Sequence, residues 1–225
     1  MNAGIIVAAG SAKRLKSKIN KPYLKLNNDY IINFSLKKFL QFSNIQVIVI
    51  VYRKKDKNIL QQIIKNYKEK KIIITVGGKE RYNSVFNGLK VLQNYKIEKV
   101  FIHDAARPFI SLNLLNKLYK CSLKNSAVVP ALKPADTIKE IYKNKIVKQT
   151  VNRNNYRLIQ TPQVFDYNKL FNIYKKNKDW TNITDDAALF EKEKEKVKII
   201  NGEKYNIKIT DKFDLLLAQK ICELL

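Results

Sequence analysis

The chain has 225 residues, of which 45% are hydrophobic and 10% aromatic, so it is a globular protein long enough to bury one sizeable core. Its formal net charge of +25 suits nucleic-acid binding, but the lysines are spread along the whole chain, without an Arg-rich arm or zinc-ligand spacing. We therefore expect no specific nucleic-acid partner.

The sequence also indicates where the protein works. Its longest apolar run, 45–52, is too short to cross a membrane, and no signal-peptide pattern precedes the first apolar run. Cys121 and Cys222 lie in predicted helices at no metal-like spacing, so we expect both to be reduced and buried. We expect a cytoplasmic location and no membrane partner.

The first apolar run, residues 4–8, predicts a strand buried on both faces, because unbroken Ile, Val and Ala are typical of parallel sheets covered by helices. Ala9 and Gly10 follow, where a ligand can approach the backbone closely. Arg14 and Lys21 then add positive charge. This pattern favours a polyphosphate site. The alternative is a strand followed by a solvated basic loop.

The middle of the chain alternates short apolar runs with amphipathic segments. Such alternation is typical of an α/β fold with a doubly wound, mostly parallel sheet. We predict that Ser84 and Ser111 are helix N-caps. The predicted strands are 45–52, 71–76, 98–103 and 126–132. The predicted helices are 31–42, a segment around 59–64, a helix after Ser84, and a helix from Ser111 through Leu123.

Polar motifs follow three of the predicted strands, after Ala8, Val76 and Ile102. Because ligands of doubly wound sheets bind outside the carboxyl ends of the strands, we expect these motifs to converge on one cleft. The loop that contains Gly78 and leads to Ser84 suits a backbone-lined pocket for a planar base. The alternative is an ordinary glycine turn.

The turn 103–108 carries the single histidine of the chain, His103, which we expect to be structural. Asp104 and Arg107 share this turn. An acid and an arginine at a strand end can bind hydroxyls and phosphate, or can pair with each other to brace the loop.

The α/β rhythm is interrupted at 134–155, where segments 137–142 and 146–151 predict a projecting β-hairpin arm. An isolated two-stranded hairpin is only marginally stable in water. We therefore expect the arm to pack against a second subunit, as a dimerisation arm.

The C-terminal part returns to helices and strands, with Thr184 as a predicted N-cap. No linker or repeat interrupts the chain, so we expect residues 1–225 to form a single domain. The remaining predicted elements are a loop at 160–165, helices at 168–176 and 185–194, strands at 197–200 and 206–210, and a closing helix at 211–225.

Two common nucleotide-binding motifs are missing from the sequence. No Gly-x-Gly-x-x-Gly follows the first strand, which disfavours a nicotinamide-binding fold. No Gly-Lys-Ser/Thr occurs either, which disfavours a Walker-type phosphate loop.

Ordered motifs along nearly the whole chain resemble one family, 2-C-methyl-D-erythritol 4-phosphate cytidylyltransferase of the non-mevalonate isoprenoid pathway. Each motif alone is weak, but their shared order and spacing make a strong signal. The motifs are Ala8-Ala9-Gly10-x-x-x-Arg14, Lys21 with Tyr23-Leu24, Gly77-Gly78-x-Glu80-Arg81-x-x-Ser84-Val85, His103-Asp104-Ala105-Ala106-Arg107-Pro108, Asp136-Thr137-Ile138-Lys139, Val151-x-Arg153, Thr161-Pro162-Gln163-x-Phe165, Thr184-Asp185 and Asn206-Ile207-Lys208-Ile209-Thr210.

The resemblance implies transfer of the cytidylyl group of CTP to a sugar-alcohol phosphate, with release of pyrophosphate. It implies Mg²⁺ or another divalent cation, held mainly by the phosphates and not by protein ligands. It also implies a homodimer formed through the arm.

The same resemblance assigns roles to residues. The implied catalytic cations are Arg14, Lys21, Arg153 and Lys208, with Arg153 donated across the dimer by the arm. The implied CTP-binding residues are Ala8, Ala9, Gly10, Gly78, Ser84, Asp104 and Ala105. The implied acceptor-binding residues are Asp104, Arg107, Thr137, Arg153, Thr161, Thr184 and Lys208.

Several positions depart from the family pattern. Ala12 replaces a usual glycine, Asn20-Lys21-Pro22 stands where Pro-Lys-Gln is expected, Asn152 replaces an acid, and Asp186 replaces a glutamate. None of these changes removes a named cation, so we expect activity to be retained.

Two alternatives to this interpretation stand. A ribitol 5-phosphate cytidylyltransferase shares most of the motifs, but that group tends to have valine where this chain has Ala106. A nucleic-acid-binding or regulatory module would keep the fold and lose catalysis. The joint presence of the four implied catalytic cations and Asp104 argues against it.

Overall fold

The computed structural model describes residues 1–10, 20–67, 71–177, 179–180 and 183–224. The strands of its main sheet are β1 (Ala3–Val7), β4 (Val47–Tyr52), β5 (Lys71–Val76), β6 (Lys99–Asp104), β7 (Ala127–Leu132), β10 (Leu158–Ile159), β11 (Gln163–Asp166) and β12 (Lys198–Asn201). Within the described residues the order of this eight-stranded sheet is β10-β7-β11-β6-β1-β4-β5, and β12 also pairs with β7. Strand β1 pairs in parallel with both of its neighbours.

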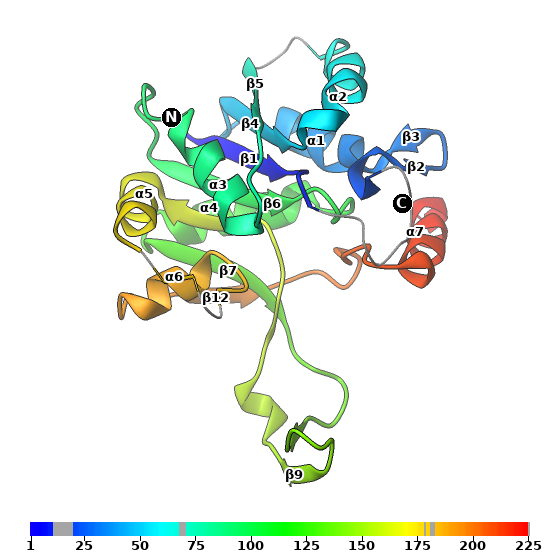
Figure 1. Cartoon of the computed structure of the whole chain (residues 1–225), viewed down its shortest axis with the longest axis vertical. Helices are drawn as coiled ribbons and strands as arrows, with labels where there is room; N and C mark the ends of the chain where they lie inside the picture. The colour runs from blue at the N-terminus through cyan, green and yellow to red at the C-terminus, as the bar shows by residue number, and fades with distance from the viewer. Residues whose placement is uncertain (11–19, 68–70, 178, 181–182, 225) are drawn as a thin grey trace.

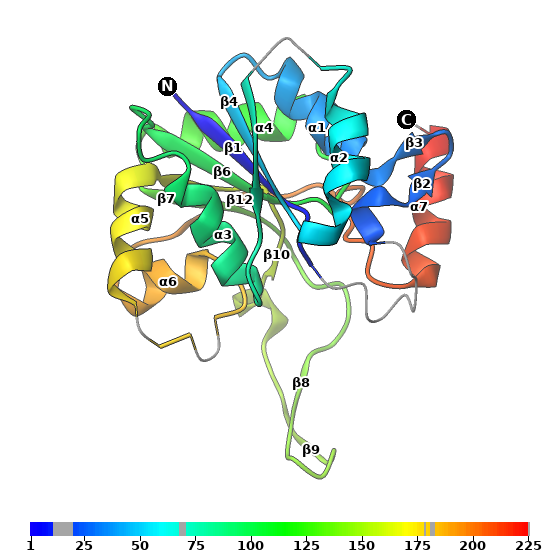
Figure 2. The ribbon, with the colours of Figure 1, turned by 45° about the horizontal axis from the view of Figure 1, so that its top comes forward.

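Helices cover both faces of the sheet (Figure 1 and Figure 2). One face carries α1 (Ile31–Gln41), α2 (Lys57–Ile64) and α4 (Leu112–Ser122), and the other carries α3 (Arg81–Lys90), α5 (Tyr167–Lys176) and α6 (Ala187–Lys192). Successive side chains of a strand point to opposite faces, so Ile5 packs into the core under α3 and Ile6 into the core under α1. This arrangement confirms the predicted doubly wound, mostly parallel α/β fold.

Helix α1 illustrates how the periodicity of the sequence builds one of these layers. Ile32, Leu36 and Phe39 recur at helical spacing and are fully buried. The ring of Phe39 packs onto β1 at Gly4, where an added Cβ would lie only 2.3 Å from Phe39 Cδ1. The close packing of α1 on β1 therefore requires a glycine at this position.

The prediction of a loop at 160–165 is wrong for the second half of that segment. Residues Gln163–Asp166 form β11, which lies antiparallel between β6 and β7. Its side chains at Val164 and Phe165 are fully buried, on opposite faces of the sheet. The short apolar run between Pro162 and a helix gives little local signal, and pairing with two sequence-distant strands decides its structure.

Two predicted helix caps are also wrong. Helix α3 begins at Arg81, one turn before the predicted cap Ser84, because Glu80 and Asn83 form a capping box. Helix α6 begins after Asp186, so Thr184 lies outside it. The predicted cap Ser111 is correct, because its hydroxyl accepts a hydrogen bond from the Leu114 amide at 2.9 Å.

Residues 206–210 do not form the predicted strand. Within this segment, Ile209 N donates to Ala106 O at 2.9 Å. Ile209 is fully buried, whereas the neighbouring Lys208 side chain keeps 41% of its surface exposed. The alternation of isoleucine and lysine at 207–209 therefore indicates which side of the segment is buried. It does not indicate that the segment pairs in a sheet.

A β-hairpin projects from the body of the protein, as predicted (Figure 1 and Figure 2). Its strands are β8 (Lys139–Ile141) and β9 (Val147–Thr150), which pair antiparallel. Apolar side chains remain exposed on it, with Ile141 at 57%, Ile146 at 59% and Val147 at 52%. The dimerisation role of this arm, like the single-domain organisation of the chain, stays a prediction.

A smaller hydrophobic cluster lies beside the main sheet. It joins the short hairpin of β2 (Lys25–Leu26) and β3 (Asp29–Tyr30) to the closing helix α7 (Lys212–Leu224). Cys121 in α4 and Cys222 in α7 are free, as expected, but they are half-buried and not fully buried. In the part of the chain that the structure describes, no helix is long and apolar enough to span a membrane.

We predict that Gly4→Ala destabilises the fold by about 1–3 kcal/mol, because the added methyl group overpacks the contact between β1 and the Phe39 ring. Chemical denaturation of the purified protein measures this change. Gly10→Ala is the matched control, since a Cβ at Gly10 meets no atom of the described residues within 4 Å. Equal stabilities of the two variants would contradict the prediction.

Candidate active site

A cavity of about 470 Å³ lies at the carboxyl ends of β1 and β6. The polar motifs that follow β1, β5 and β6 meet there, as the doubly wound topology predicts. The sequence-predicted residues that line this first cavity are Ala9, Gly10, Lys21, Gly78, Ser84, Asp104 and Lys208.

A second cavity, of about 440 Å³, adjoins the first. Three residues, Arg81, Asp104 and Lys208, line both cavities and so form a shared wall. The sequence-predicted residues that line the second cavity are Asp104, Arg107, Thr161, Thr184 and Lys208.

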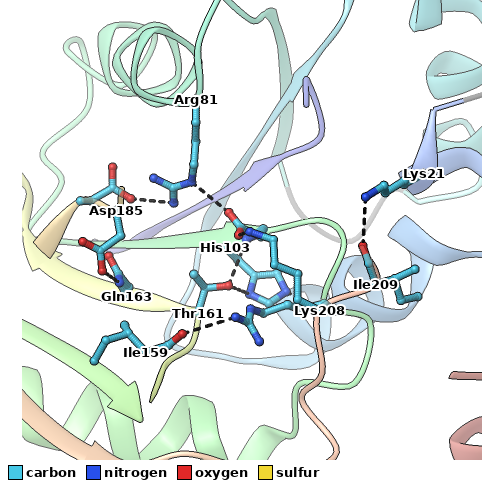
Figure 3. A network of polar contacts seen from close by, with 12 residues as sticks. Lys21, Arg81, His103, Ile159, Thr161, Gln163, Asp185, Lys208 and Ile209 are labelled. Atoms are coloured by element: carbon cyan, nitrogen blue, oxygen red, sulfur yellow. Dashed lines mark hydrogen bonds and ion pairs between the residues drawn. The ribbon is translucent and has the colours of Figure 1, made fainter. Parts of the chain in front are cut away.

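Lys21 is held in the first cavity by its neighbour in sequence. Asn20 is buried, and its amide donates to Ala8 O at 2.8 Å and to Asp56 Oδ2 at 3.3 Å. Lys21 Nζ donates to Thr210 O at 2.6 Å and to Ile209 O at 3.5 Å, the second of which Figure 3 shows. These contacts place the ammonium against the C-terminal segment. The departure from the family pattern at Asn20 thus supplies the side chain that ties this loop to the end of β1.

The glycine loop before α3 packs directly on the end of β1. A Cβ on Gly77 would lie 2.3 Å from Ala9 Cβ, so only glycine allows this approach. The Ser84 hydroxyl accepts from Gly78 N at 3.1 Å and donates to Glu80 O at 3.1 Å. Ser84 therefore fixes the loop backbone from inside the helix instead of capping the helix.

The shared wall is a network of charges. Asp104, the last residue of β6, accepts from Lys208 Nζ at 2.6 Å and from Arg81 Nε at 3.1 Å (Figure 3). Burial alone would raise the pKa of Asp104, but the nearby cations Arg81 and Lys208 outweigh it and hold that pKa well below its usual range. Asp104 is therefore ionised, and one of its partners, Lys208, lies on the far C-terminal segment.

Sequence reasoning missed Arg81, to which it gave no role. Its Nη2 atom lies 2.8 Å from Asp186 Oδ2, so the guanidinium lies between two carboxylates. Burial would lower the pKa of Arg81, but the coulombic attraction of Asp186 and Asp104 raises it well above its usual value. The available signal was its place in the glycine motif, but its partner Asp186 is remote in sequence.

His103 is structural, as expected, and connects two walls of the second cavity. Its Nδ1 lies 3.0 Å from Thr161 Oγ1 and its Nε2 lies 2.9 Å from Arg107 O (Figure 3). Asp104 N donates to the same Thr161 hydroxyl at 3.1 Å. One proton arrangement satisfies all three contacts: Thr161 donates to a neutral ring at Nδ1, and Nε2–H donates to the Arg107 carbonyl.

Arg107 was expected either to serve the site or to brace the turn through Asp104. Its guanidinium donates to Asn206 O at 2.8 Å and to Ile159 O at 3.4 Å. These contacts tie the turn after β6 to the C-terminal segment and to β10. Arg107 therefore braces the second cavity through backbone carbonyls.

Some of the expected site residues lie elsewhere. Arg14, like Ala12, falls outside the described residues. Ala8 and Ala105 are fully buried, and their neighbours Ala9 and Ala106 line the first cavity in their place.

Thr137 and Arg153 lie on the exposed arm, and neither lines the first or second cavity of its own chain. The Arg153 guanidinium donates to the carbonyl of Ala135, within the arm.

A doubly wound sheet with a cationic two-part cleft at its strand ends is the architecture of a nucleotidyltransferase. Comparison with known proteins gives the particular family. The family model for IspD, 2-C-methyl-D-erythritol 4-phosphate cytidylyltransferase, matches residues 3–223. The chain belongs to this family, and the predicted family and enzyme class are confirmed.

Individual relatives agree with this assignment. An enzyme of that name from Clostridioides difficile is 39% identical, with 98% of this chain and 93% of that protein covered. The bifunctional enzyme IspD/IspF of Pelagibacter ubique is 42% identical, but this chain spans only 55% of its length. A solved 4-diphosphocytidyl-2C-methyl-D-erythritol synthase from Anaerococcus prevotii superimposes with a TM-score of 0.89 at 35% identity, covering 98% of this chain and 95% of that one.

The buried histidine gives a prediction about pH. Burial lowers the pKa of His103 to about 4. The unfolded chain, with an ordinary histidine pKa near 6.5, binds more protons between these values, so folding stability should fall by up to about 3 kcal/mol as the pH drops from 6.5 to 4.

NMR of the single imidazole measures this pKa and its tautomer directly, because the chain has one histidine. We expect the Nε2–H tautomer and no titration near pH 6.5. His103→Gln should show a weaker loss of stability over the same pH range. A ring that titrates near pH 6.5 in the folded protein would exclude this arrangement.

Proposed function

We infer that this chain transfers the cytidylyl group of CTP to 2-C-methyl-D-erythritol 4-phosphate and releases pyrophosphate, in isoprenoid precursor biosynthesis. The observation that carries this inference is the two-part cleft, in a chain that the family model matches over residues 3–223. Such a reaction needs two anionic substrates side by side, and the wall formed by Arg81, Asp104 and Lys208 is common to both cavities.

The reaction is an in-line displacement at phosphorus. A phosphate oxygen of the acceptor forms a bond to the α-phosphorus of CTP, and the bond from that phosphorus to the bridging oxygen breaks. The electron pair leaves with pyrophosphate. Little covalent chemistry falls to the protein, so its side chains act by positioning the substrates and by neutralising charge.

The first cavity suits CTP. The Gly78 loop, fixed by Ser84, offers backbone groups to a planar base, and Gly10 leaves room for the triphosphate at the end of β1. Lys21 meets the charge that develops on the phosphates in the transition state, together with Arg14 as the second cation of the same loop.

The second cavity suits the acceptor. The Thr161 hydroxyl already donates to His103 and accepts from Asp104 N, so its remaining lone pair can accept a bond from an acceptor hydroxyl. Thr184 and Arg107 line the same cavity. Lys208, which keeps 41% of its side-chain surface exposed, exchanges its contact with Asp104 for the acceptor phosphate.

A magnesium ion fits this site if the substrates hold most of it. Among the described residues, no three His, Cys, Asp or Glu side chains gather as a metal site. Mg²⁺ typically binds one or two carboxylates together with substrate phosphates, which is compatible with the single carboxylate of Asp104 in the shared wall. When bound, the ion would neutralise phosphate charge.

The exposed arm supports a homodimer in which it packs against a second copy of the chain. The arm exposes the apolar side chains of Ile141, Ile146 and Val147, and it carries Thr137 and Arg153 away from both cavities of its own chain. Packing against a second copy would cover the apolar side chains and bring Arg153 to the partner's acceptor phosphate. A cytoplasmic location completes the proposal, in keeping with two free cysteines.

One assay tests the activity. Purified protein with CTP and magnesium should release pyrophosphate with 2-C-methyl-D-erythritol 4-phosphate and much more slowly with ribitol 5-phosphate. Faster pyrophosphate release with ribitol 5-phosphate would show that ribitol 5-phosphate is the acceptor. No release with either acceptor would contradict the proposed activity. Tight, sequence-dependent binding to DNA that persists at physiological salt would instead favour the nucleic-acid module.

Mixing two inactive variants tests the arm. If Arg153 acts across the dimer, Arg153→Ala co-expressed with Lys208→Ala should recover about a quarter of wild-type turnover, because about half of randomly formed dimers are hybrid and each hybrid has one intact site. Each variant alone is the control. Turnover of the mixture no higher than the mean of the two variants would contradict donation across the dimer.

A further inference from the structure

Arg81 joins three elements of the fold at the wall between the two cavities. It is the first residue of α3, and its guanidinium contacts Asp104 at the end of β6 and Asp186 at the start of α6. Asp186 is 1% exposed and also accepts from the Tyr174 hydroxyl at 2.5 Å. One end of the Arg81 guanidinium is thus anchored to a buried carboxylate, and the other is directed at the site.

The anchor matters because Lys208 has two tasks. Lys208 pairs with Asp104 at 2.6 Å, whereas the proposed acceptor binding requires the same ammonium for a phosphate. A buried carboxylate that loses its counterion is costly. Arg81 remains beside Asp104 when Lys208 moves, because Asp186 holds it in place.

We propose that Arg81, anchored by Asp186, is a positioning residue that fixes the Asp104 carboxylate in the shared wall and so allows Lys208 to leave it for the acceptor phosphate. The proposal rests on the proposed function. It also gives a reason for the acid at Asp186: although one methylene shorter than the usual glutamate, it reaches Arg81 at 2.8 Å.

Three cations face the Asp104 carboxylate, each from a different element packed around it. They are Arg81 from α3, Lys208 from the C-terminal segment, and Arg107 from its own turn. These cations keep Asp104 ionised. Without Arg81, Lys208 and Arg107 still face the carboxylate, so Lys208 is then tied to Asp104 as its nearest cation.

The test compares Arg81→Gln with Lys99→Gln in the full-length enzyme. Lys99 is the first residue of β6, at the opposite end of that strand from Asp104, and it makes a partly buried ion pair with Asp166 of β11. Lys99→Gln therefore controls for the loss of an ion pair away from the site. We expect Arg81→Gln to raise KM for the acceptor on the order of tenfold, with a smaller change in kcat, because Lys208 is then needed by Asp104.

Lys99→Gln should lower only the melting temperature. If Arg81→Gln fails to fold, Arg81→Lys carries the test, because one ammonium cannot contact two carboxylates as a guanidinium does. An acceptor KM within twofold of wild type overturns the positioning role for whichever variant folds. If the wild-type enzyme shows no transferase activity, the proposed function itself is contradicted.

Discussion

The site depends on one buried charge, the Asp104 carboxylate at the end of the central strand β6. A carboxylate taken out of water must be compensated, and here the compensation comes from residues distant in sequence, Arg81 and Lys208. Those two ion pairs join the glycine loop and the C-terminal segment to the sheet. The wall that separates the two cavities is a consequence of this requirement.

The layered α/β fold positions the Asp104 carboxylate. Parallel strands β1, β6 and β4 end at the same edge, so their polar extensions meet, and helices on both faces exclude water from the strands. The antiparallel strand β11 then brings Thr161 beside His103. A chain of hydrogen bonds from Asp104 N through Thr161 and His103 to Arg107 makes the second cavity rigid without any further charge.

The arm contrasts with this compact centre. It carries exposed apolar side chains and two residues with expected roles at an active site, Thr137 and Arg153, yet neither lines the first or the second cavity. In the proposed homodimer these two residues come to the site from the other copy. Catalysis and assembly would then depend on the same segment.

The sequence by itself determined the family, the enzyme class, the doubly wound sheet and the projecting hairpin, because ordered motifs and periodic apolar runs are local signals. Topology also predicted that Lys21 and Gly78 meet at one cleft, and the family resemblance placed Lys208 there. Only the tertiary structure decided that Gln163–Asp166 is a strand, that residues 206–210 are not, and that Arg81 is held between two carboxylates. The physical reason is the same in each case: strand pairing and ion pairing depend on partners far along the chain, which no local pattern specifies.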